Sequence, residues 1–355
     1  MDKKIVALLF GGQSSEHEVS KKSAITILNA LSEEKYFVLP IYITTEGKWF
    51  LYDGPKENIG VNGWQKFATP VVLSPDAAHR GILRLVGERF KVIPVDVVFP
   101  ILHGKNGEDG TIQGLCELAQ IPYVGCGVLS SAVCMDKVFA KIVVESLGIR
   151  QADYVVVSRA DLRDKEKLDA ICKDIRYKLG YPCFVKPSKA GSSVGIKKAA
   201  KKAELVDALF LAALHDEKII VEKGILGREF ECAVLGNENA AASPVGEIRY
   251  TADFYDYDAK YADETSCTIV PADIPEAISQ EMRDIALKVY KACDCKGMAR
   301  VDFFMNKKNE IIFNEINTVP GFTSISMYAM LWKEGGLPMP DLCDRLITLA
   351  LEQSE

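Results

Sequence analysis

The stretch GMARVDFFMNKKNEIIFNEINTVPGFTSIS, residues 297–326, decides the fold of this chain. Two apolar-rich runs of strand length, residues 301–305 and 310–316, flank a polar turn at residues 306–309. This pattern predicts a β-hairpin. The hairpin carries four polar residues where a buried sheet would be apolar, so it is the first candidate for a functional surface.

A turn that is symmetric about Lys307 and Lys308 predicts that Arg300 faces Glu315 and that Asp302 faces Phe313. Because side chains alternate between the two faces of a strand, the four polar residues share one face: Arg300, Asp302, Glu315 and Asn317. Two carboxylates and an amide oxygen suit Mg²⁺. The alternative is an exposed hairpin with a solvated polar face and a cross-strand Arg–Glu pair. A one-residue slip in the turn would also separate the four side chains.

Length and composition exclude several classes of protein. A chain of 355 residues predicts two or three domains. The net charge of −6 argues against a nucleic-acid partner. No apolar run reaches the length of a membrane helix, and the first run is too short for a signal peptide. The ten scattered cysteines indicate reduced core residues, and with them a cytoplasmic protein.

The N-terminal part alternates strands with helices, which predicts a parallel sheet with crossovers. The expected strands are residues 5–10, 36–43 and 96–101, and the expected helices are 20–31 and 110–120. Loops 11–20 and 103–110 follow strands, where such sheets bind ligands. Taken alone, the first loop favours a strand-to-helix turn with Ser20 as N-cap, beside which Glu16 complements the helix dipole. His103, taken alone, favours a capping or packing role.

The central part contains a loop suited to phosphate. We expect strands at residues 183–187, 196–199 and 218–222 and helices at 136–147 and 203–214. Loop 186–195, KPSKAGSSVG, is small, polar and cationic, which is typical of a phosphate cradle. The alternative is a flexible hairpin turn, but Lys186 lies within an apolar strand. Lys137 lies in the first turn of the expected helix 136–147, where a cation is disfavoured unless an anion is near. The alternative is a solvated lysine beside Asp136.

Acidic residues then follow a strand that resembles a hinge. A planar base could bond the backbone of residues 221–225 while Glu222 and Glu229 accept hydrogen bonds from amine or ribose groups. Surface acids at a sheet edge are the alternative. Residues 249–270 are polar and tyrosine-rich without clear periodicity, which predicts a lid. Helices are expected at 276–292 and 342–351.

Eight motifs occur in an order that resembles the D-alanine–D-alanine ligase family of the ATP-grasp superfamily. They are GGQSSEHEVS, HGKNGEDG, MDK, VKPSKAGSSVG, VEKGILGREF, FYDYDAKY, GMARVDFF and NEINTVPGFTSIS. The resemblance covers about residues 4–350. It implies a three-domain α/β ATP-grasp fold with a parallel-sheet domain at residues 1–127, a central subdomain at 128–222 and a C-terminal subdomain at 223–355 with the lid at 249–270.

The resemblance also implies roles for individual residues. By this resemblance, ATP phosphates contact Lys137, Lys186 and, once the lid closes, Lys260. The base and ribose contact Glu222, Lys223, Ile225 and Glu229. Two Mg²⁺ (or Mn²⁺) ions are bound by Asp302, Glu315 and Asn317. By the same resemblance, Glu16, Ser192 and Tyr261 form a triad around the first D-alanine, with His103 nearby. Arg300 and the Gly321 amide stabilise the oxyanion of the tetrahedral intermediate. Ser326 and the Met327 amide bind the carboxylate of the second D-alanine.

The implied reaction is ATP-dependent formation of D-alanyl-D-alanine through an acyl phosphate, by a homodimer without nucleic-acid or membrane partners. The rival within the family is a D-alanine–D-serine ligase, which tends to carry arginine where this chain has Met327. The D-lactate variants usually lack the tyrosine at position 261. A remote rival is a non-catalytic ATP-binding module. Ile325 and Ala299 depart from the family pattern, where histidine and glycine are common.

Overall fold

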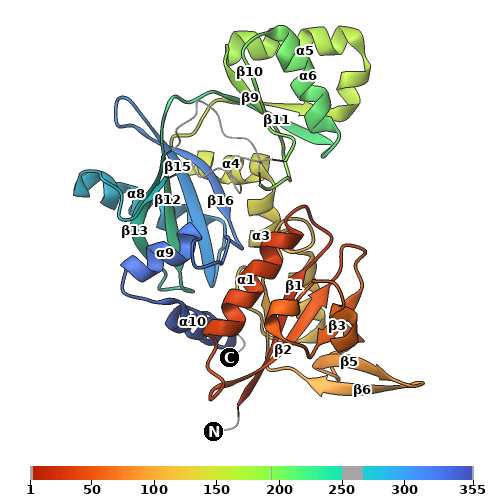
Figure 1. Ribbon diagram of the computed structural model, residues 1–355. Helices are drawn as coiled ribbons and strands as arrows, with labels where there is room; N and C mark the ends of the chain where they lie inside the picture. The colour runs from red at the N-terminus through yellow and green to blue at the C-terminus, as the bar shows by residue number, and fades with distance from the viewer. Residues whose placement is uncertain (1–2, 193, 250–266, 354–355) are drawn as a thin grey trace.

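Three β-sheets follow one another along the chain, with helices packed beside each (Figure 1). The computed structural model describes residues 3–192, 194–249 and 267–353. The first sheet spans residues 4–100, the second 154–223 and the third 227–317. The domain boundaries after residues 127 and 222 stay predictions. None of the helices in the described part of the chain is long and apolar enough to cross a membrane.

The first sheet has the strand order β6-β5-β4-β3-β2-β1-β7. The predicted parallel centre is confirmed, since β1 pairs in parallel with both β2 and β7. The four strands that lie between β2 and β7 along the chain, β3 to β6, extend the sheet beyond β2 in antiparallel pairing. They were not expected, because their short runs carry no strong alternation. The elements are β1 (Lys4–Gly11), α1 (His17–Ala30), β2 (Tyr36–Ile43), β3 (Trp49–Tyr52), β4 (Ala68–Leu73), β5 (Gly81–Val86), β6 (Arg89–Pro94), β7 (Val97–Pro100) and α2 (Thr111–Ala119), with 3-10 helices at Lys56–Asn58 and Trp64–Phe67.

The second sheet is antiparallel and small, with the order β10-β9-β11-β8. Two helices, α3 and α4, lead into it, and α5 and α6 cover it at the top of Figure 1. Its predicted strands and helices are confirmed within two residues. The elements are α3 (Val128–Met135), α4 (Lys137–Ser146), β8 (Tyr154–Ser158), α5 (Lys165–Lys178), β9 (Cys183–Pro187), β10 (Lys197–Ala199), α6 (Lys202–Ala213) and β11 (Lys218–Lys223), with a 3-10 helix at Arg159–Arg163.

The third sheet, in the order β14-β13-β12-β15-β16, contains the predicted hairpin. Helix α8 covers the face on which Val301 and Phe303 are buried, and the helix at 276–292 is confirmed. Its elements are β12 (Gly227–Leu235), β13 (Ala241–Arg249), β14 (Cys267–Ile269), α8 (Glu276–Ala292), β15 (Met298–Asn306), β16 (Ile311–Asn317), α9 (Met327–Glu334) and α10 (Met339–Glu352).

The register of the hairpin differs from the predicted one. Arg300 pairs with Asn317, and Asp302 pairs with Glu315; the pairs predicted from a symmetric turn, Arg300 with Glu315 and Asp302 with Phe313, are wrong. The turn shifts the pairing by one residue, and a β-bulge after Asp302 shifts it by one more. Because two one-residue shifts restore the alternation, the four polar side chains still share one face.

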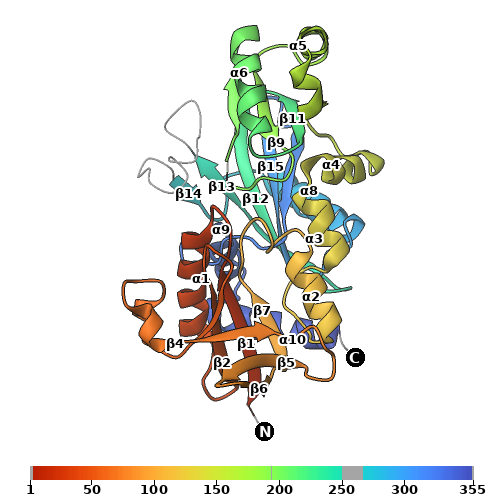
Figure 2. The same cartoon turned by 90° about the vertical axis from the view of Figure 1, so that its right-hand side faces the viewer.

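One apolar core joins the first sheet to the C-terminal helices (Figure 2). Phe10 of β1 and Phe99 of β7 belong to the same buried cluster as Tyr328 of α9 and Leu346 of α10. The ring centroids of Phe99 and Phe322 are 6.2 Å apart. This contact brings the loops after β1 and β7 against the end of the hairpin.

Three further expectations are corrected. Helix α1 begins at His17, and the Ser20 hydroxyl donates to the Ile101 carbonyl and accepts from the Gly11 N–H, so Ser20 is not the N-cap. The predicted lid at 249–270 is corrected at its two ends, because Arg249 of β13 pairs with Cys267 of β14, whereas residues 250–266 lie outside the described part of the chain. All ten cysteines are free, as expected, but Cys267 is exposed and not a core residue.

Gly11 and Gly63 both have a φ of +88° and provide a matched test of this packing. A Cβ at Gly11 would lie 2.2 Å from the Ile43 carbonyl oxygen, whereas a Cβ at Gly63 would meet nothing within 4 Å. We expect Gly63→Ala to lower the unfolding free energy by about 1 kcal/mol through strain alone. We expect Gly11→Ala to cost roughly 1–3 kcal/mol more, because backbone must move. Thermal unfolding of both variants measures the difference, and equal losses would contradict the predicted overlap.

Candidate active site

The polar face of the hairpin is built around Arg300. Its guanidinium donates to both carboxylate oxygens of Asp302, at 2.7 and 2.8 Å, and its Nε lies 2.8 Å from Glu231. Burial alone would lower the pKa of Arg300, but the Asp302 and Glu231 carboxylates raise it well above its usual range. Two buried carboxylates are tolerated here because a buried cation lies between them.

Sequence reasoning missed Glu231. It lies on β12 directly opposite Asp302 of β15, and its side chain is 7% exposed. The available signal was the acid within the run FECAVL, residues 230–235, which is otherwise apolar, because a buried carboxylate requires a cationic partner. Arg300 therefore holds the sheet together electrostatically as well as facing the site.

Asp302, Glu315 and Asn317 supply oxygens that fit a divalent cation. Asp302 and Glu315 are cross-strand neighbours, and the Asn317 amide donates to Asp302 at 3.0 Å. That hydrogen bond uses the amide nitrogen and leaves the amide oxygen as a possible ligand. No group of three His, Cys, Asp or Glu side chains in the described ranges could hold a metal by itself. The two carboxylates and one amide oxygen thus require further oxygens, which phosphates provide.

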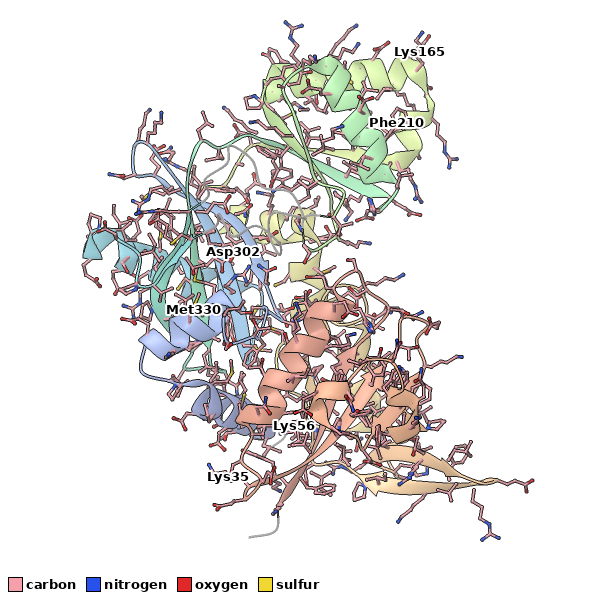
Figure 3. The ribbon with its side chains drawn as sticks, viewed as in Figure 1. Lys35, Lys56, Lys165, Phe210, Asp302 and Met330 are labelled. Atoms are coloured by element: carbon pink, nitrogen blue, oxygen red, sulfur yellow. The ribbon has the colours of Figure 1, made fainter. Side chains whose placement is uncertain are left out.

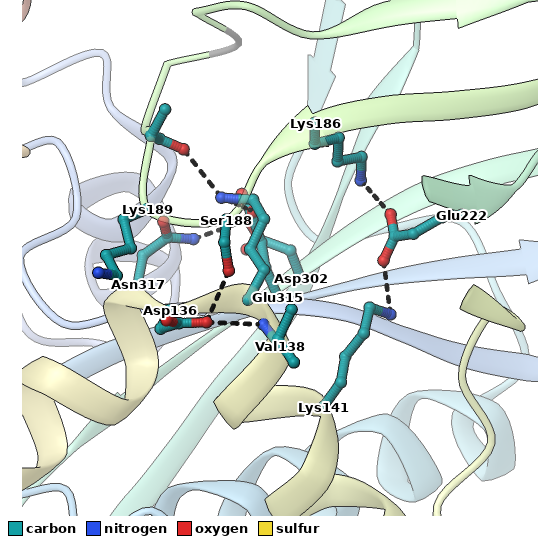
Figure 4. A network of polar contacts seen from close by, with 12 residues as sticks. Asp136, Val138, Lys141, Lys186, Ser188, Lys189, Glu222, Asp302, Glu315 and Asn317 are labelled. Atoms are coloured by element: carbon teal, nitrogen blue, oxygen red, sulfur yellow. Dashed lines mark hydrogen bonds and ion pairs between the residues drawn. The ribbon is translucent and has the colours of Figure 1, made fainter. Parts of the chain in front are cut away.

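The loop between β9 and β10 faces this surface from the second sheet (Figure 4). Lys137, the first residue of α4, donates to the Ala190 carbonyl at 2.9 Å and lies 3.4 Å from Glu315. The anion expected near Lys137 is therefore a carboxylate of the third sheet. Figure 3 places Asp302 between the second sheet above and the first sheet below.

Lys186 lies among acids of both sheets. Its Nζ is 2.5 Å from Glu222. Burial alone would lower the pKa of Lys186, yet the carboxylates of Glu222, Glu315 and Glu229 raise it. Glu229 is half-buried on β12. Lys223, the last residue of β11, is exposed, and Ile225, two residues further on, is half-buried. Lys186, which is predicted to contact phosphate, thus lies near Glu222 and Glu229, which are predicted to contact the base and ribose.

Lys141 is a second residue that sequence reasoning missed. It lies one turn after Lys137 on α4, its side chain is 2% exposed, and its Nζ is 2.7 Å from Glu222. A lysine on the buried face of an amphipathic helix was the available signal, because buried lysines are almost always paired.

The loop after β1 reaches the loop between β9 and β10. The Ser192 hydroxyl donates to the buried Glu16 carboxylate, which joins the N-terminal loop to the second sheet. A Cβ at Gly191 would lie 2.8 Å from Glu16 Oε2, so glycine permits this approach. The structure therefore brings together two members of the predicted triad. Tyr261 and Lys260 lie outside the described residues.

His103 and Glu108 connect the loop after β7 to the end of the hairpin. His103 contacts the Ser23 hydroxyl at 3.2 Å and the Val319 carbonyl at 3.0 Å. Burial lowers the pKa of His103, although the Glu16 carboxylate opposes this. Glu108, which sequence reasoning did not single out, accepts from the N–H groups of Gly104 at 2.6 Å and Val319 at 3.2 Å.

The predicted second-substrate residues lie at the start of α9. The Ser326 hydroxyl lies 2.7 Å from that of Thr323, and a Cβ at Gly321 would be 3.1 Å from Ser326 Oγ. Met327 is the first residue of α9, and its side chain is buried in the core beneath the helix. Ile325, one of the departures from the family pattern, is 81% exposed.

Comparisons with known proteins agree along the whole chain. Residues 5–126 match the family model described as the D-ala D-ala ligase N-terminus, and residues 143–348 match the D-ala D-ala ligase C-terminus. A D-alanine–D-alanine ligase of Acetivibrio thermocellus is 50% identical, covering 99% of this chain and 97% of that protein. One from Caldicellulosiruptor bescii is 49% identical, covering 100% and 97%.

Solved structures are similar over nearly the same span. The VanG D-Ala:D-Ser ligase from Enterococcus faecalis is 43% identical with a TM-score of 0.89, covering 98% of this chain and 100% of that one. The D-alanine–D-alanine ligase from Coxiella burnetii is 36% identical with a TM-score of 0.85, covering 99% and 96%.

Glu108 generates a prediction on pH. Burial and the Glu16 carboxylate raise the pKa of Glu108 to about 8, against the lowering by its two N–H donors. A carboxyl whose pKa is higher in the folded state binds its proton more tightly there, so its contribution to stability is lost as the pH rises toward and through 8. We expect the melting temperature of the native protein to fall relative to that of Glu108→Gln between pH 6 and 9. Asp109→Asn is the neighbouring control. A constant offset between native protein and Glu108→Gln would show that Glu108 does not titrate in this range.

Proposed function

The chain belongs to the D-alanine–D-alanine ligase family, and we propose that it joins two D-alanine molecules through an acyl phosphate at the expense of ATP. The observation that carries the proposal is the meeting of two charged surfaces. Lys137 and Lys186 of the central part face Arg300, Asp302 and Glu315 of the hairpin. Two cations opposite two carboxylates and an arginine suit a nucleotide phosphate held with divalent metal.

ATP is expected to lie between the second and third sheets. Its phosphates would contact Lys137 and Lys186, and its base and ribose would contact Glu222, the backbone of Lys223 and Ile225, and Glu229. Asp302, Glu315 and Asn317 would hold two Mg²⁺ or Mn²⁺. Such ions, when bound, neutralise phosphate charge and offset the repulsion between the two carboxylates.

Charge stabilisation and positioning account for the chemistry. The carboxylate of the first D-alanine attacks the γ-phosphorus of ATP, which gives D-alanyl phosphate and ADP. The amine of the second D-alanine then attacks the acyl carbon, a proton leaves the nitrogen, and phosphate departs. Arg300 and the Gly321 N–H would stabilise the negative oxygen of the tetrahedral intermediate. Arg300 is well placed for this because Asp302 and Glu231 hold its orientation.

The first D-alanine would be bound from the N-terminal side. Its ammonium would contact Glu16, with His103 close by, and Ser192 and Tyr261 would complete the triad. Lys260 would reach phosphate on closure of the lid, which excludes water from the acyl phosphate. The hydrogen bond from Ser192 to Glu16 supports this arrangement because it couples the loop after β1 to the loop between β9 and β10.

The second D-alanine would place its carboxylate at Ser326 and the Met327 N–H, which begins helix α9 and so favours an anion. The Met327 side chain is buried beneath the helix and offers no donor to a serine hydroxyl, which favours D-alanine over D-serine. The similarity to a D-Ala:D-Ser ligase structure keeps D-serine as the second candidate. We further propose that the protein is a cytoplasmic homodimer. Light scattering of the purified protein tests the oligomeric state.

The assay of second-substrate preference tests the proposed activity. We expect ATP-dependent phosphate release that requires D-alanine, with D-alanyl-D-alanine as the main product when D-alanine competes with equal D-serine or D-lactate at neutral pH. The measurement is phosphate release with product identification by mass spectrometry. A mixed product rich in D-serine or D-lactate would overturn the substrate assignment. Phosphate release that no D-amino acid stimulates would instead favour a non-catalytic nucleotide-binding module.

Arg300→Lys tests the proposed oxyanion role. Lysine keeps a cation between Asp302 and Glu231 but loses the paired donors of the guanidinium. We expect kcat to fall roughly 100-fold or more, as when an oxyanion donor is removed, while binding of a non-hydrolysable ATP analogue is retained. Steady-state kinetics and calorimetry measure the two effects. An unchanged kcat would remove Arg300 from the mechanism.

A further inference from the structure

Lys141 forms a buried charge cluster with Glu222 and Lys186 (Figure 4). Lys141 approaches Glu222 Oε1 from α4 at 2.7 Å, and Lys186 approaches Oε2 from β9 at 2.5 Å. The side chains of Lys141 and Glu222 are only 2% and 5% exposed. Each oxygen of one carboxylate is therefore occupied by a different ammonium group.

The cluster carries one more positive than negative charge. Burial alone would raise the pKa of Glu222, but Lys141 and Lys186 lower it to about 2, so the carboxylate is ionised at neutral pH. Within the described part of the chain, Glu222 is the anion that pairs with Lys141. Among these three side chains the surplus charge consequently belongs to Lys186, which is 12% exposed and is also attracted by the Glu315 and Glu229 carboxylates of the third sheet.

Without Lys141, Lys186 would be the only neutralising partner of a buried carboxylate. Moving Lys186 toward a phosphate would then leave Glu222 buried without a cation, which is costly. With Lys141 in place, Glu222 stays neutralised when Lys186 turns to a new anion. Lys141 is suited to this permanent role because it is anchored on α4 and more deeply buried, with its ammonium 5.7 Å from the Tyr154 ring centre.

We propose that Lys141 is a positioning residue for ATP: it neutralises Glu222 permanently and so leaves the charge of Lys186 available to the nucleotide phosphates. The proposal rests on the proposed function, because it assumes that Lys186 contacts phosphate. It predicts that Lys141 increases the affinity for phosphate groups and leaves the affinity for the nucleoside nearly unchanged. A lysine that only stabilises the fold would change the affinities for ATP and for the nucleoside by the same factor.

The test compares adenosine with a non-hydrolysable ATP analogue, with each dissociation constant measured by calorimetry in the presence of magnesium. The dissociation constant for adenosine divided by that for the ATP analogue reports how much the phosphates contribute to affinity. We expect Lys141→Met to lower this ratio roughly tenfold or more, as for loss of a charged hydrogen bond, with little change in adenosine binding. Lys178→Met is the matched control, because its partner Asp174 lies in an exposed pair on α5.

A double variant separates positioning from folding. Lys141→Met leaves Glu222 with Lys186 alone, whereas Lys141→Met with Glu222→Gln leaves no buried carboxylate to neutralise. We expect the second change to restore the ratio toward the native value and to recover any loss of melting temperature. A ratio that stays native in Lys141→Met, an equal loss for both ligands, or a double variant without recovery would each overturn the proposal.

The outcome is distinguishable from failure of the proposed function. If the native protein binds the ATP analogue and releases phosphate in response to D-alanine, the function stands whatever Lys141→Met does. If the native protein binds the analogue no better than adenosine, Lys186 does not serve phosphate, and the assumption on which this inference rests is wrong.

Discussion

The burial of Asp302 is the constraint on which the rest of the site depends. A carboxylate that is 8% exposed in the middle of a sheet requires a cation. Arg300 meets that requirement from two residues away on the same strand, and Glu231 on the neighbouring strand holds the other side of the guanidinium. The same arrangement fixes the direction of the arginine and presents acidic oxygens on one face. Structural stability and the proposed chemistry thus use the same ion pairs.

Charge also connects the second and third sheets. Lys137 lies 3.4 Å from Glu315 across the site. The carboxylates of Glu229 and Glu315, as well as that of Glu222, raise the pKa of Lys186. The two facing surfaces carry opposite charges, so the second and third sheets attract each other across the site. A nucleotide with its metal would replace these contacts by similar ones, because phosphate takes the place of carboxylate at the lysines and metal takes the place of lysine at the carboxylates.

The N-terminal sheet contributes through an apolar contact. Phe99 and Phe322, with Tyr328 and the C-terminal helix, form one core that spans the first and last parts of the chain. This packing brings Glu16, His103 and Glu108 to the end of the hairpin, where Val319 bonds both His103 and Glu108. Gly191 allows its loop to approach Glu16 closely, and Gly11 allows the end of β1 to approach the Ile43 carbonyl. The predicted substrate residues come from distant segments and therefore meet because the core beneath them is shared.

The sequence by itself determined the hairpin, its shared polar face and most helices and strands, because alternation and turn composition are local properties. It also indicated the ligand-binding loops, since motif order resembles a family. Only the tertiary structure decided the register, because a bulge after Asp302 has no distinct local signal. The partners of buried charges were likewise undetermined: the sequence places Glu231 and Lys141 among apolar residues, but it does not say which distant charge lies within 3 Å of each. Long-range packing sets that proximity, and local pattern does not encode it.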